Sequence, residues 1–258
     1  ATYYLIDLSE KYTKFIHLFD SVNNVFHMAA EVAISYCVEK PNESMANNML
    51  STMNVLECCR IHNVDRAVFS STCAVYGNTM FNPNYETNSV DCLNTYSISK
   101  YSGEMLFKMY YELYGVKTVV FRYFNVYGEG QKPNSFYSAV VPNFIKQSQN
   151  NLPLTIYNSG NQKRDFINVK DVCEAIYKAI NYKKSDTFNI GTGNAIKIKY
   201  LAELILKEYV NGKLKYSKTT KFDASYSCAN IYKTGKFLKF KAKIDIKKGI
   251  KELINYEI

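Results

Sequence analysis

The sequence lacks several features that would assign a chain to a class at once. Its 258 residues contain no tryptophan and three histidines, and none of its seven cysteines forms a C-x-x-C pair. Without such spacing we expect no metal site, and we expect reduced thiols in a reducing compartment. No stretch approaches the roughly 20 apolar residues of a membrane span, and no basic-then-apolar signal segment opens the chain. The cytoplasm is therefore the expected location, with no membrane partner.

The positive charge of the chain also lacks the pattern of a nucleic-acid-binding surface. The formal net charge is +9, and the lysines are densest over residues 233–251. No stripe of aromatic residues lies between these lysines, and no zinc-finger spacing is present, so we expect a solvated surface and no nucleic-acid partner. A hydrophobic fraction of 47% and a charged fraction of 21% are ordinary for a globular chain with a substantial core.

Short β-type runs alternate with helical patterns along the first three quarters of the chain. The β-type runs are residues 2–6, 25–30, 66–69, 117–123, 166–169 and 187–190. The helical patterns between them are residues 10–20, 42–62 and 96–114, the last of which stops at Gly115. This alternation predicts an α/β fold with a Rossmann-like parallel sheet flanked by helices.

A change of composition after Gly128 predicts a second, smaller lobe. Glycine, proline and asparagine interrupt residues 128–162, which reads as a loop-rich segment. We therefore expect residues 1–127 to form the Rossmann-like domain, to which residues 163–193 return. Residues 128–162 and 194–258 would form a smaller mixed C-terminal lobe that binds the substrate.

Tyr96 and Lys100 are the strongest candidates for chemistry. Residues i and i+4 of a helix share a face, so the phenol and the ammonium can point into one cleft. A nearby cation favours the phenolate and lowers the tyrosine pKa from its usual value near 10, which suits general acid–base work. Taken alone the spacing is weak evidence, because the chain has 23 tyrosines. A solvated helix face is the alternative.

Other candidates follow the predicted strands, where open α/β sheets bind ligands. Asp7 and Leu8 follow the first run, where an acidic residue can meet the adenosine half of a dinucleotide; a capping aspartate is an equally good interpretation. Ala29 and Ala30 are small enough to let a ligand approach the backbone. The hydroxyl residues 70–72 (SST) end the strand before the Tyr96 helix.

Seven motifs in order resemble one family. They are residues 25–30 (VFHMAA), 48–57 (NMLSTMNVLE), 70–77 (SSTCAVYG), 96–100 (YSISK), 122–128 (RYFNVYG), 164–169 (RDFINV) and 188–193 (FNIGTG). Together they resemble the extended short-chain dehydrogenase/reductases that act on nucleotide sugars. The resemblance covers almost the whole chain.

The resemblance implies NAD as cofactor, a UDP-sugar as substrate and a homodimer formed through a bundle that includes the 97–114 helix. It implies Thr72, Tyr96 and Lys100 as catalytic residues. The implied cofactor-binding residues are Asp7, Leu8, Ala29, Ala30, Asn48, Ser70, Ser71, Tyr96, Lys100 and Tyr123. The implied substrate-binding residues are Thr72, Asn125, Val141, Tyr157 and Arg164.

Within this family, Ala74 favours epimerases. Dehydratases and decarboxylases of nucleotide sugars usually carry an acid at that position, which acts on a second sugar carbon. The run 122–144 looks most like epimerases of UDP-N-acetylglucosamine and UDP-glucose, whereas uronate epimerases tend to have threonine in place of Asn125. We therefore expect NAD-dependent inversion at C4 of a UDP-hexose. The alternatives are a 4,6-dehydratase or decarboxylase, or a remnant that binds a UDP-sugar without turnover.

The sequence departs from the family pattern in its glycines. The family begins with a strand and a G-x-x-G-x-x-G turn that holds the cofactor diphosphate, whereas the first glycine here is Gly77. We expect this sequence to be part of a longer protein, since the downstream catalytic residues look intact; a remnant that binds NAD poorly is the other possibility. A family arginine near Asp223 is not evident, and Lys221 is a possible substitute.

Overall fold

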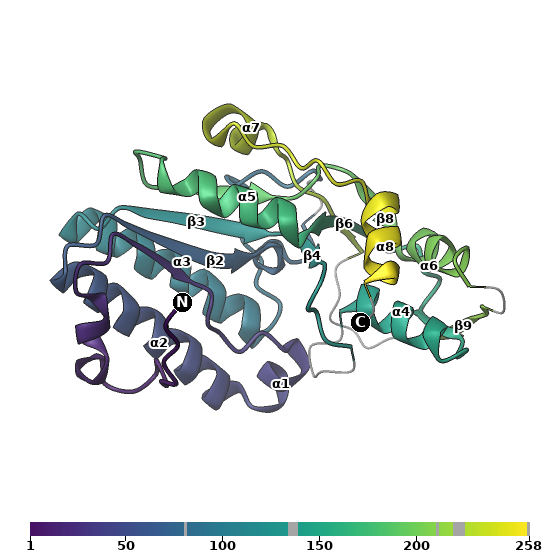
Figure 1. Ribbon diagram of the computed structural model, residues 1–258, viewed down its shortest axis with the longest axis horizontal. Coiled ribbons are helices and arrows are strands. Elements are labelled where there is room, and N and C mark those ends of the chain that lie inside the picture. The colour runs from purple at the N-terminus through teal and green to yellow at the C-terminus, as the bar shows by residue number, and fades with distance from the viewer. Residues whose placement is uncertain (80–81, 134–138, 210–211, 219–224, 257–258) are drawn as a thin grey trace. The chain divides into compact units, whose positions relative to one another are not determined.

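A four-stranded sheet forms the centre of the first part of the molecule (Figure 1). The computed structural model describes residues 1–79, 82–133, 139–209, 212–218 and 225–256. The sheet contains β1 (Asn24–His27), β2 (Arg66–Thr72), β3 (Thr118–Tyr123) and β7 (Asp186–Ile190), in the order β1-β2-β3-β7. β1 and β2 pair in parallel, with Asn24 opposite Arg66.

Two long helices cover one face of this sheet (Figure 1). α2 (Pro41–Ile61) has proline at its first position, where no backbone N–H is needed. α3 (Thr95–Tyr114) ends at Gly115, whose φ of 74° is the left-handed conformation that glycine adopts without strain. Both helices bury apolar residues against β2 and β3, and the core they form includes Leu56, Phe69 and Phe107.

The second part of the molecule contains a smaller mixed sheet and most of the remaining helices. β6 (Lys163–Asn168) pairs in parallel with β4 (Asn125–Tyr127) and β10 (Tyr226–Ser227), and antiparallel with β8 (Ala195–Lys197). β5 (Leu154–Tyr157) and β9 (Leu214–Ser217) form a separate parallel pair. The helices are α4 (Val140–Gln149), α5 (Val169–Ile180), α6 (Ile198–Leu206), α7 (Tyr232–Leu238) and α8 (Ile246–Asn255). Phe144, Ile145, Leu201 and Ile250 lie in its core.

The chain divides into two compact units. Unit 1 comprises Ala1–Val75, Cys92–Arg122 and Ala179–Phe188; unit 2 comprises Tyr76–Asp91, Tyr123–Lys178 and Asn189–Ile258. The expected return of residues 163–193 to the first domain is therefore wrong over most of its length. β6 pairs with β4, β8 and β10 rather than with the β1-β2-β3-β7 sheet, so it belongs to unit 2.

Most predicted elements of unit 1 are confirmed within one to three residues, and the exceptions lie before β1. Residues 2–6 form no strand: no partner strand pairs with them in the part of the chain that the structure describes, and Tyr3 and Leu5 are exposed. Residues 10–20 form two 3₁₀ turns, Tyr12–Lys14 and Ile16–Phe19, rather than one α-helix. A third 3₁₀ turn, Cys73–Tyr76, and a short helix α1 (Ile34–Glu39) complete the element order.

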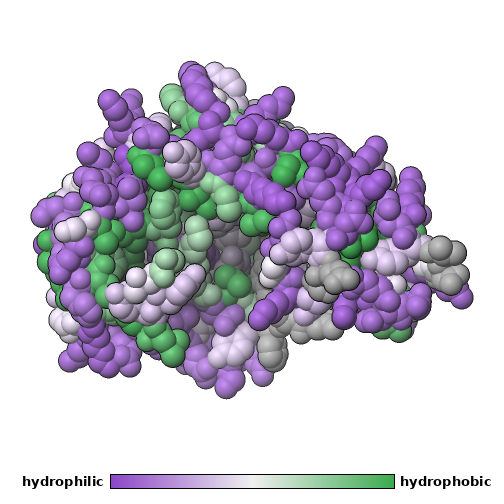
Figure 2. Space-filling model, in the orientation of Figure 1, coloured by the Kyte–Doolittle hydropathy of each residue, from purple (hydrophilic) through white to green (hydrophobic). Residues whose placement is uncertain are grey.

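No helix among the described residues is long and apolar enough to cross a membrane. Hydrophilic residues cover most of the face shown in Figure 2. All seven cysteines are described, and none of them forms a disulfide. Lys221 and Asp223, and residues 134–138 of the 122–144 run, lie outside the described residues.

Candidate active site

The N-terminus of α3 fixes the position of Tyr96. Asn94 accepts a hydrogen bond from the Ser97 N–H at 2.9 Å, and the Asn94 N–H donates to the Ser97 hydroxyl at 3.2 Å, which forms a reciprocal capping box. Tyr96 is the second residue of the helix and is half-buried. The positive end of the helix dipole favours a negative charge at this point, so the local structure suits a phenolate.

Lys100 lies one helical turn after Tyr96 and is 3% exposed. Its Nζ is 4.5 Å from the centroid of the Phe69 ring, which belongs to β2. Burial lowers the pKa of Lys100 to about 8, and the Glu104 carboxylate opposes that shift. The ammonium donates no hydrogen bond to any described residue, although it has three N–H donors, so its donors remain available to a ligand.

Phe69 forms an aromatic support for this ammonium. Its ring stacks on Phe107 with centroids 4.8 Å apart and on His27 with centroids 5.7 Å apart. The ring can lie against α3 only because residue 103 is glycine: a Cβ there would come within 2.5 Å of it. Burial, together with the charge of Lys100, lowers the pKa of His27 to about 3, so this imidazole is neutral at pH 7.

Asn48 connects the loop after β1 to α3. Its Oδ1 accepts the Glu31 N–H at 2.7 Å, and its Nδ2 donates to the Glu31 carbonyl at 3.0 Å and to the Ser99 hydroxyl at 2.9 Å. The Ser99 hydroxyl donates in turn to the carbonyl of Tyr96 at 2.8 Å. The side chain of Asn48 thus fixes the loop that contains Ala29 and Ala30 to the turn of α3 that bears Tyr96.

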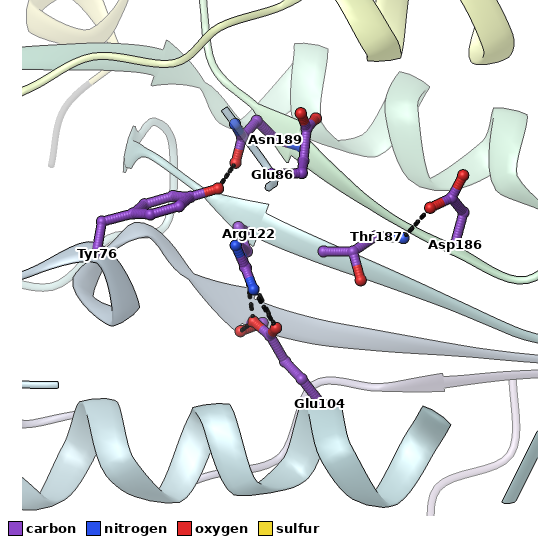
Figure 3. A network of polar contacts seen from close by, with 8 residues as sticks. Tyr76, Glu86, Glu104, Arg122, Asp186, Thr187 and Asn189 are labelled. Carbon is purple, nitrogen blue, oxygen red and sulfur yellow. Dashed lines mark hydrogen bonds and ion pairs between the residues drawn. The ribbon is translucent and has the colours of Figure 1, made fainter. Parts of the chain in front are cut away.

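A buried ion pair lies next along α3 (Figure 3). The Glu104 carboxylate accepts hydrogen bonds from Arg122 Nε at 3.0 and 3.2 Å and from Arg122 Nη2 at 2.7 Å. The Ser71 hydroxyl donates to the same carboxylate at 2.5 Å. Glu104 and Ser71 are each 3% exposed and Arg122 is 5% exposed. The proton of the Ser71 hydroxyl is therefore engaged within unit 1 and is not available to donate to a cofactor.

Thr72 ends β2, the strand that also supplies Phe69 and Ser71. Its Oγ1 accepts the N–H of Ala74 at 3.1 Å, which starts the following 3₁₀ turn. The side chain is nearly buried, at 9% exposed, and the neighbouring Ser70 is half-buried. α3 packs on β2 through the contacts of Phe69 and Ser71, so the elements that bear Thr72, Tyr96 and Lys100 adjoin in unit 1.

A pocket of about 340 Å³ with a mixed polar and apolar lining opens beside Asp7, the residue predicted to meet the adenosine. Its lining includes Asp7, Ser9, Glu31 and Glu43. The Asp7 carboxylate accepts the N–H and the hydroxyl of Ser9 at 2.8 and 2.6 Å, and these bonds lower the pKa of Asp7. Leu8 is half-buried, and its carbonyl accepts a hydrogen bond from the Asn54 amide at 2.8 Å. Asp7 both stabilises its own turn and faces a ligand-sized space.

In unit 2, Arg164 and Asn125 lie on the paired strands β6 and β4. Arg164 is 7% exposed, and its Nη1 donates to the Lys163 carbonyl at 2.9 Å. The Asn125 amide donates to the Asp165 carbonyl at 3.2 Å. The pairing of β4 with β6 places Asn125 opposite Phe166, two residues after Arg164. The two residues predicted to contact the nucleotide therefore lie close together.

The other predicted residues of unit 2 differ in their exposure. Val141 is 2% exposed and packs in the core with Phe144 and Ile145, so its side chain supports α4 rather than facing a ligand. Tyr157 is 56% exposed at the end of β5. Tyr123 ends β3 and is half-buried.

Asp165 is a structural centre that sequence analysis did not single out. It is fully buried, and Oδ1 accepts the Thr192 N–H and hydroxyl at 2.9 and 2.5 Å. Oδ2 accepts the N–H groups of Gly193 and Ala229 at 2.9 and 3.1 Å. Two features of the sequence could have pointed to this role: Asp165 follows the predicted Arg164 directly, and the later motif 188–193 contains the glycine-rich GTG segment. This carboxylate holds the GTG segment and the chain around Ala229 next to β6.

Two of the sequence motifs meet through Asn189 (Figure 3). The Tyr76 hydroxyl donates to Asn189 Oδ1 at 2.6 Å, and the Asn189 N–H donates to the Glu86 carboxylate at 2.8 Å. Asn189 Nδ2 donates to the Asn84 carbonyl at 2.8 Å. The tyrosine of VYG and the asparagine of FNIGTG therefore anchor the segment between Tyr76 and Asp91 within unit 2.

The fold is that of a Rossmann-like α/β protein, and Tyr96 and Lys100 lie one turn apart near the N-terminus of α3. The sequence matches the NAD dependent epimerase/dehydratase family over residues 3–191. The chain belongs to this family.

Known relatives agree with this assignment. A protein of Methanocaldococcus jannaschii with the provisional name UDP-glucose 4-epimerase is 36% identical over 97% of this chain and 80% of its own length. The UDP-N-acetylglucosamine 4-epimerase of Methanobrevibacter ruminantium, solved with UDP-N-acetylmuramic acid, is 30% identical with a TM-score of 0.93, over 97% of this chain and 81% of that one. The UDP-glucose 4-epimerase of Thermotoga maritima, solved with UDP-glucose, is 28% identical with a TM-score of 0.95, over 99% and 84%.

The residues of unit 1 fit the NAD that this family uses. Lys100 presents a nearly buried ammonium whose donors meet no acceptor among the described side chains, which suits the hydroxyls of a ribose. Asp7 borders a pocket that can take part of a nucleoside. Ala29 and Ala30 place no bulky side chain on the loop that Asn48 fixes. These residues would hold the cofactor through its ribose groups and along this loop.

Proposed function

We propose that the protein is an NAD-dependent epimerase that inverts C4 of a UDP-hexose through a 4-keto intermediate. The substrate pairs we propose are UDP-N-acetylglucosamine with UDP-N-acetylgalactosamine, or UDP-glucose with UDP-galactose. The observation that carries this proposal is Tyr96 in the first turn of α3, with the buried Lys100 one turn later, in a member of this family. Its relatives with epimerase names extend over most of the chain.

The residues of unit 1 supply the proton chemistry of this reaction. Tyr96, as phenolate, would remove the proton from the 4-hydroxyl of the sugar. Lys100 and the N-terminus of α3 favour that phenolate through their positive charge. Thr72 would hydrogen-bond the same sugar oxygen and guide the proton to and from Tyr96. Bound NAD supplies the hydride acceptor and the hydride that returns to the opposite face.

The residues of unit 2 would hold the nucleotide while the sugar turns over. We assign the diphosphate to Arg164, because a guanidinium binds phosphate oxygens in a bidentate manner. Asn125 and Tyr157 would contact the rest of the nucleotide sugar. A firm hold on the diphosphate with a roomy sugar site is what inversion requires, since the 4-keto sugar must present both faces.

Ala74 separates this proposal from the dehydratases of the same family. It lies in the 3₁₀ turn after Thr72, half-buried, and brings no carboxylate to the chemistry. Removal of water or carbon dioxide needs an acid or base at a second carbon, and this position does not provide one. Removal and return of the 4-hydroxyl proton, which inversion at C4 requires, needs only Tyr96, Lys100 and Thr72.

The direct test incubates the purified protein and NAD with each of the four UDP-sugars and separates the products by anion-exchange chromatography with mass detection. We expect a product of unchanged mass and altered retention. A product lighter by water or carbon dioxide would contradict the epimerase assignment. No conversion by protein shown to contain bound NAD would reject the activity itself.

Tyr96→Phe is the matched variant for this assay. It removes one hydroxyl, keeps the ring, and should lower kcat by about a hundredfold or more. UDP binding, measured by calorimetry, should stay unchanged because the predicted nucleotide contacts lie in unit 2. Full activity in Tyr96→Phe would show that another group moves the proton.

We also propose a cytoplasmic homodimer. The outward faces of the two long helices expose Leu50 and Met53 on α2 and Ile98, Met105 and Tyr111 on α3, each between 42% and 45% exposed. Such apolar residues on adjacent helices suit a helical bundle with a second copy. Light scattering after size exclusion should give twice the mass of the chain, and cell fractionation should recover the protein without membranes.

A further inference from the structure

Three charged side chains lie in the interior of unit 1, and one of them, Lys100, belongs to the predicted catalytic pair. Lys100 and Glu104 are one turn apart on α3, and Arg122 comes from β3. Glu104 and Lys100 are each 3% exposed, and Arg122 is 5% exposed. Arg122 and Ser71 occupy the carboxylate of Glu104 with hydrogen bonds of 2.5 to 3.2 Å. This group of four residues is called the Glu104 cluster below.

The Glu104 cluster contains two cations and one anion, so it leaves one net positive charge. A phenolate at Tyr96 balances that charge, whereas a neutral phenol leaves it in place. Replacing Glu104 by a neutral residue would leave two buried cations near each other, which strongly disfavours the ammonium form of Lys100. The anion therefore affects the state of Lys100 directly.

Stability alone does not account for the Glu104–Arg122 pair. Burying two charges has a desolvation cost that their attraction often only offsets, and apolar replacements of such pairs are often neutral or stabilising. The hydroxyl of Ser71 donates a hydrogen bond to the same carboxylate. The feature that an apolar replacement could not supply is a fixed negative charge one turn from Lys100.

We infer that Glu104 is a positioning residue for the reaction, whose carboxylate, held by Arg122 and Ser71, keeps Lys100 in its charged form. This inference rests on the proposed function, because it concerns the lysine that favours the Tyr96 phenolate. Glu104 touches neither substrate nor cofactor in this scheme. It acts through the charge of Lys100 and sets the highest pH at which Tyr96 and Lys100 support the reaction.

The groups around Lys100 leave Glu104 as the source of this effect. From β1, His27 is coupled to Lys100 but neutral, since its pKa is about 3. From β2 comes the uncharged Phe69 ring. On α2, Asn48 donates to Ser99 and Thr52 hydrogen-bonds His27, and neither side chain ionises. On α3 itself, Tyr96 lies one turn earlier and is the group whose ionisation the charge of Lys100 favours. Arg122, from β3, opposes Glu104 rather than assisting it.

The test measures the ionisation of Lys100 without measuring catalysis. The full chain is labelled with ¹³C at lysine Cε, the Lys100 resonance is identified by its loss in Lys100→Arg, and its shift is followed between pH 6 and 11. In the wild type we expect a midpoint near pH 8. Glu104→Gln should lower that midpoint by about one pH unit. Glu112→Gln is the matched control on the same helix, because its side chain is 57% exposed; it should leave the midpoint unchanged.

Arg122→Met keeps the test decisive if Glu104→Gln does not fold. It removes the opposing cation and should raise the Lys100 midpoint, a shift of opposite sign that a purely structural role would not produce. The alkaline limb of kcat should move with the midpoint in each folded variant. Unchanged Lys100 midpoints in Glu104→Gln or Arg122→Met would overturn the inference. Shifted midpoints in a protein that converts no UDP-sugar would instead count against the proposed function.

Discussion

Gly103→Ala is the substitution for which the structure gives the clearest magnitude. A Cβ at this position lies 2.5 Å from Cζ and 2.9 Å from Cε1 of Phe69. Favourable carbon contacts lie at about 3.5–4.0 Å, so the ring must retreat by roughly 1 Å. Overpacking of a filled core costs about 1–3 kcal/mol, and the better helix propensity of alanine returns about 1 kcal/mol. We expect a net loss of stability of about 1 kcal/mol.

Gly235→Ala in α7 is the matched control for this prediction. The nearest atom to its added Cβ is the Phe240 carbonyl oxygen at 3.8 Å, an ordinary contact. Only the propensity gain remains, so this variant should be about 1 kcal/mol more stable than the wild type. The two variants should therefore differ by about 2 kcal/mol although the chemical change is identical.

Urea unfolding followed by circular dichroism measures this difference through the transition midpoint at constant slope. Because Phe69 supports Lys100, the ¹³C signal of that lysine should also move in Gly103→Ala and stay in place in Gly235→Ala. Equal stabilisation by both substitutions would refute the reasoning, since it would mean that Phe69 can leave the face of α3 without cost.

Three further predictions concern other parts of the site. Because burial depresses the pKa of Lys100 to about 8 and the mechanism needs its ammonium form, kcat/KM should fall as the pH rises through about 8; a profile flat to pH 10 would contradict this assignment. Asp165→Asn should lower the free energy of unfolding by about 3 kcal/mol, because an amide has one acceptor oxygen and cannot accept hydrogen bonds from Thr192, Gly193 and Ala229 as both carboxylate oxygens do. A free energy of unfolding in urea within about 0.5 kcal/mol of the wild type, which is no more than one ordinary hydrogen bond, would contradict this prediction. NADP should support turnover about tenfold less well than NAD, because the carboxylate of Asp7 borders the pocket that we propose for the adenosine and would repel a 2′-phosphate. Equal rates with the two cofactors in a titration would contradict this assignment of Asp7.

Local signals in the sequence were sufficient for the elements that carry the candidate site. Asn94 and Gly115 bound α3 through a capping box and a left-handed residue, both of which act within a few positions of the chain. β2 and β3 each contain three consecutive apolar residues, 67–69 and 119–121, which is typical of strands buried on both faces. The helical pattern that stops at Gly115 and the β-type runs predicted the elements that bear Tyr96, Lys100 and Thr72, and the resemblance of the motifs predicted the family.

Pairing between distant segments decided what local patterns could not. The β-prone run at residues 2–6 forms no strand, because a strand also needs a neighbour to complete its hydrogen bonds. β6 joins unit 2 rather than the first sheet because it pairs with β4, β8 and β10. Val141 resembled a substrate contact in sequence but packs in the core of unit 2.

By itself, then, the sequence determined the family, the α3 helix and the tyrosine–lysine spacing, because all of these depend on residues near one another in the chain or on ordered motifs. The tertiary structure alone decided that Lys100 lies on Phe69, that Glu104 is paired with Arg122, and that Asp165 holds the GTG segment. Those contacts join residues up to 64 positions apart, as between Asp165 and Ala229. The physical reason is that burial and charge balance arise only when strands and helices pack, and no local pattern encodes them.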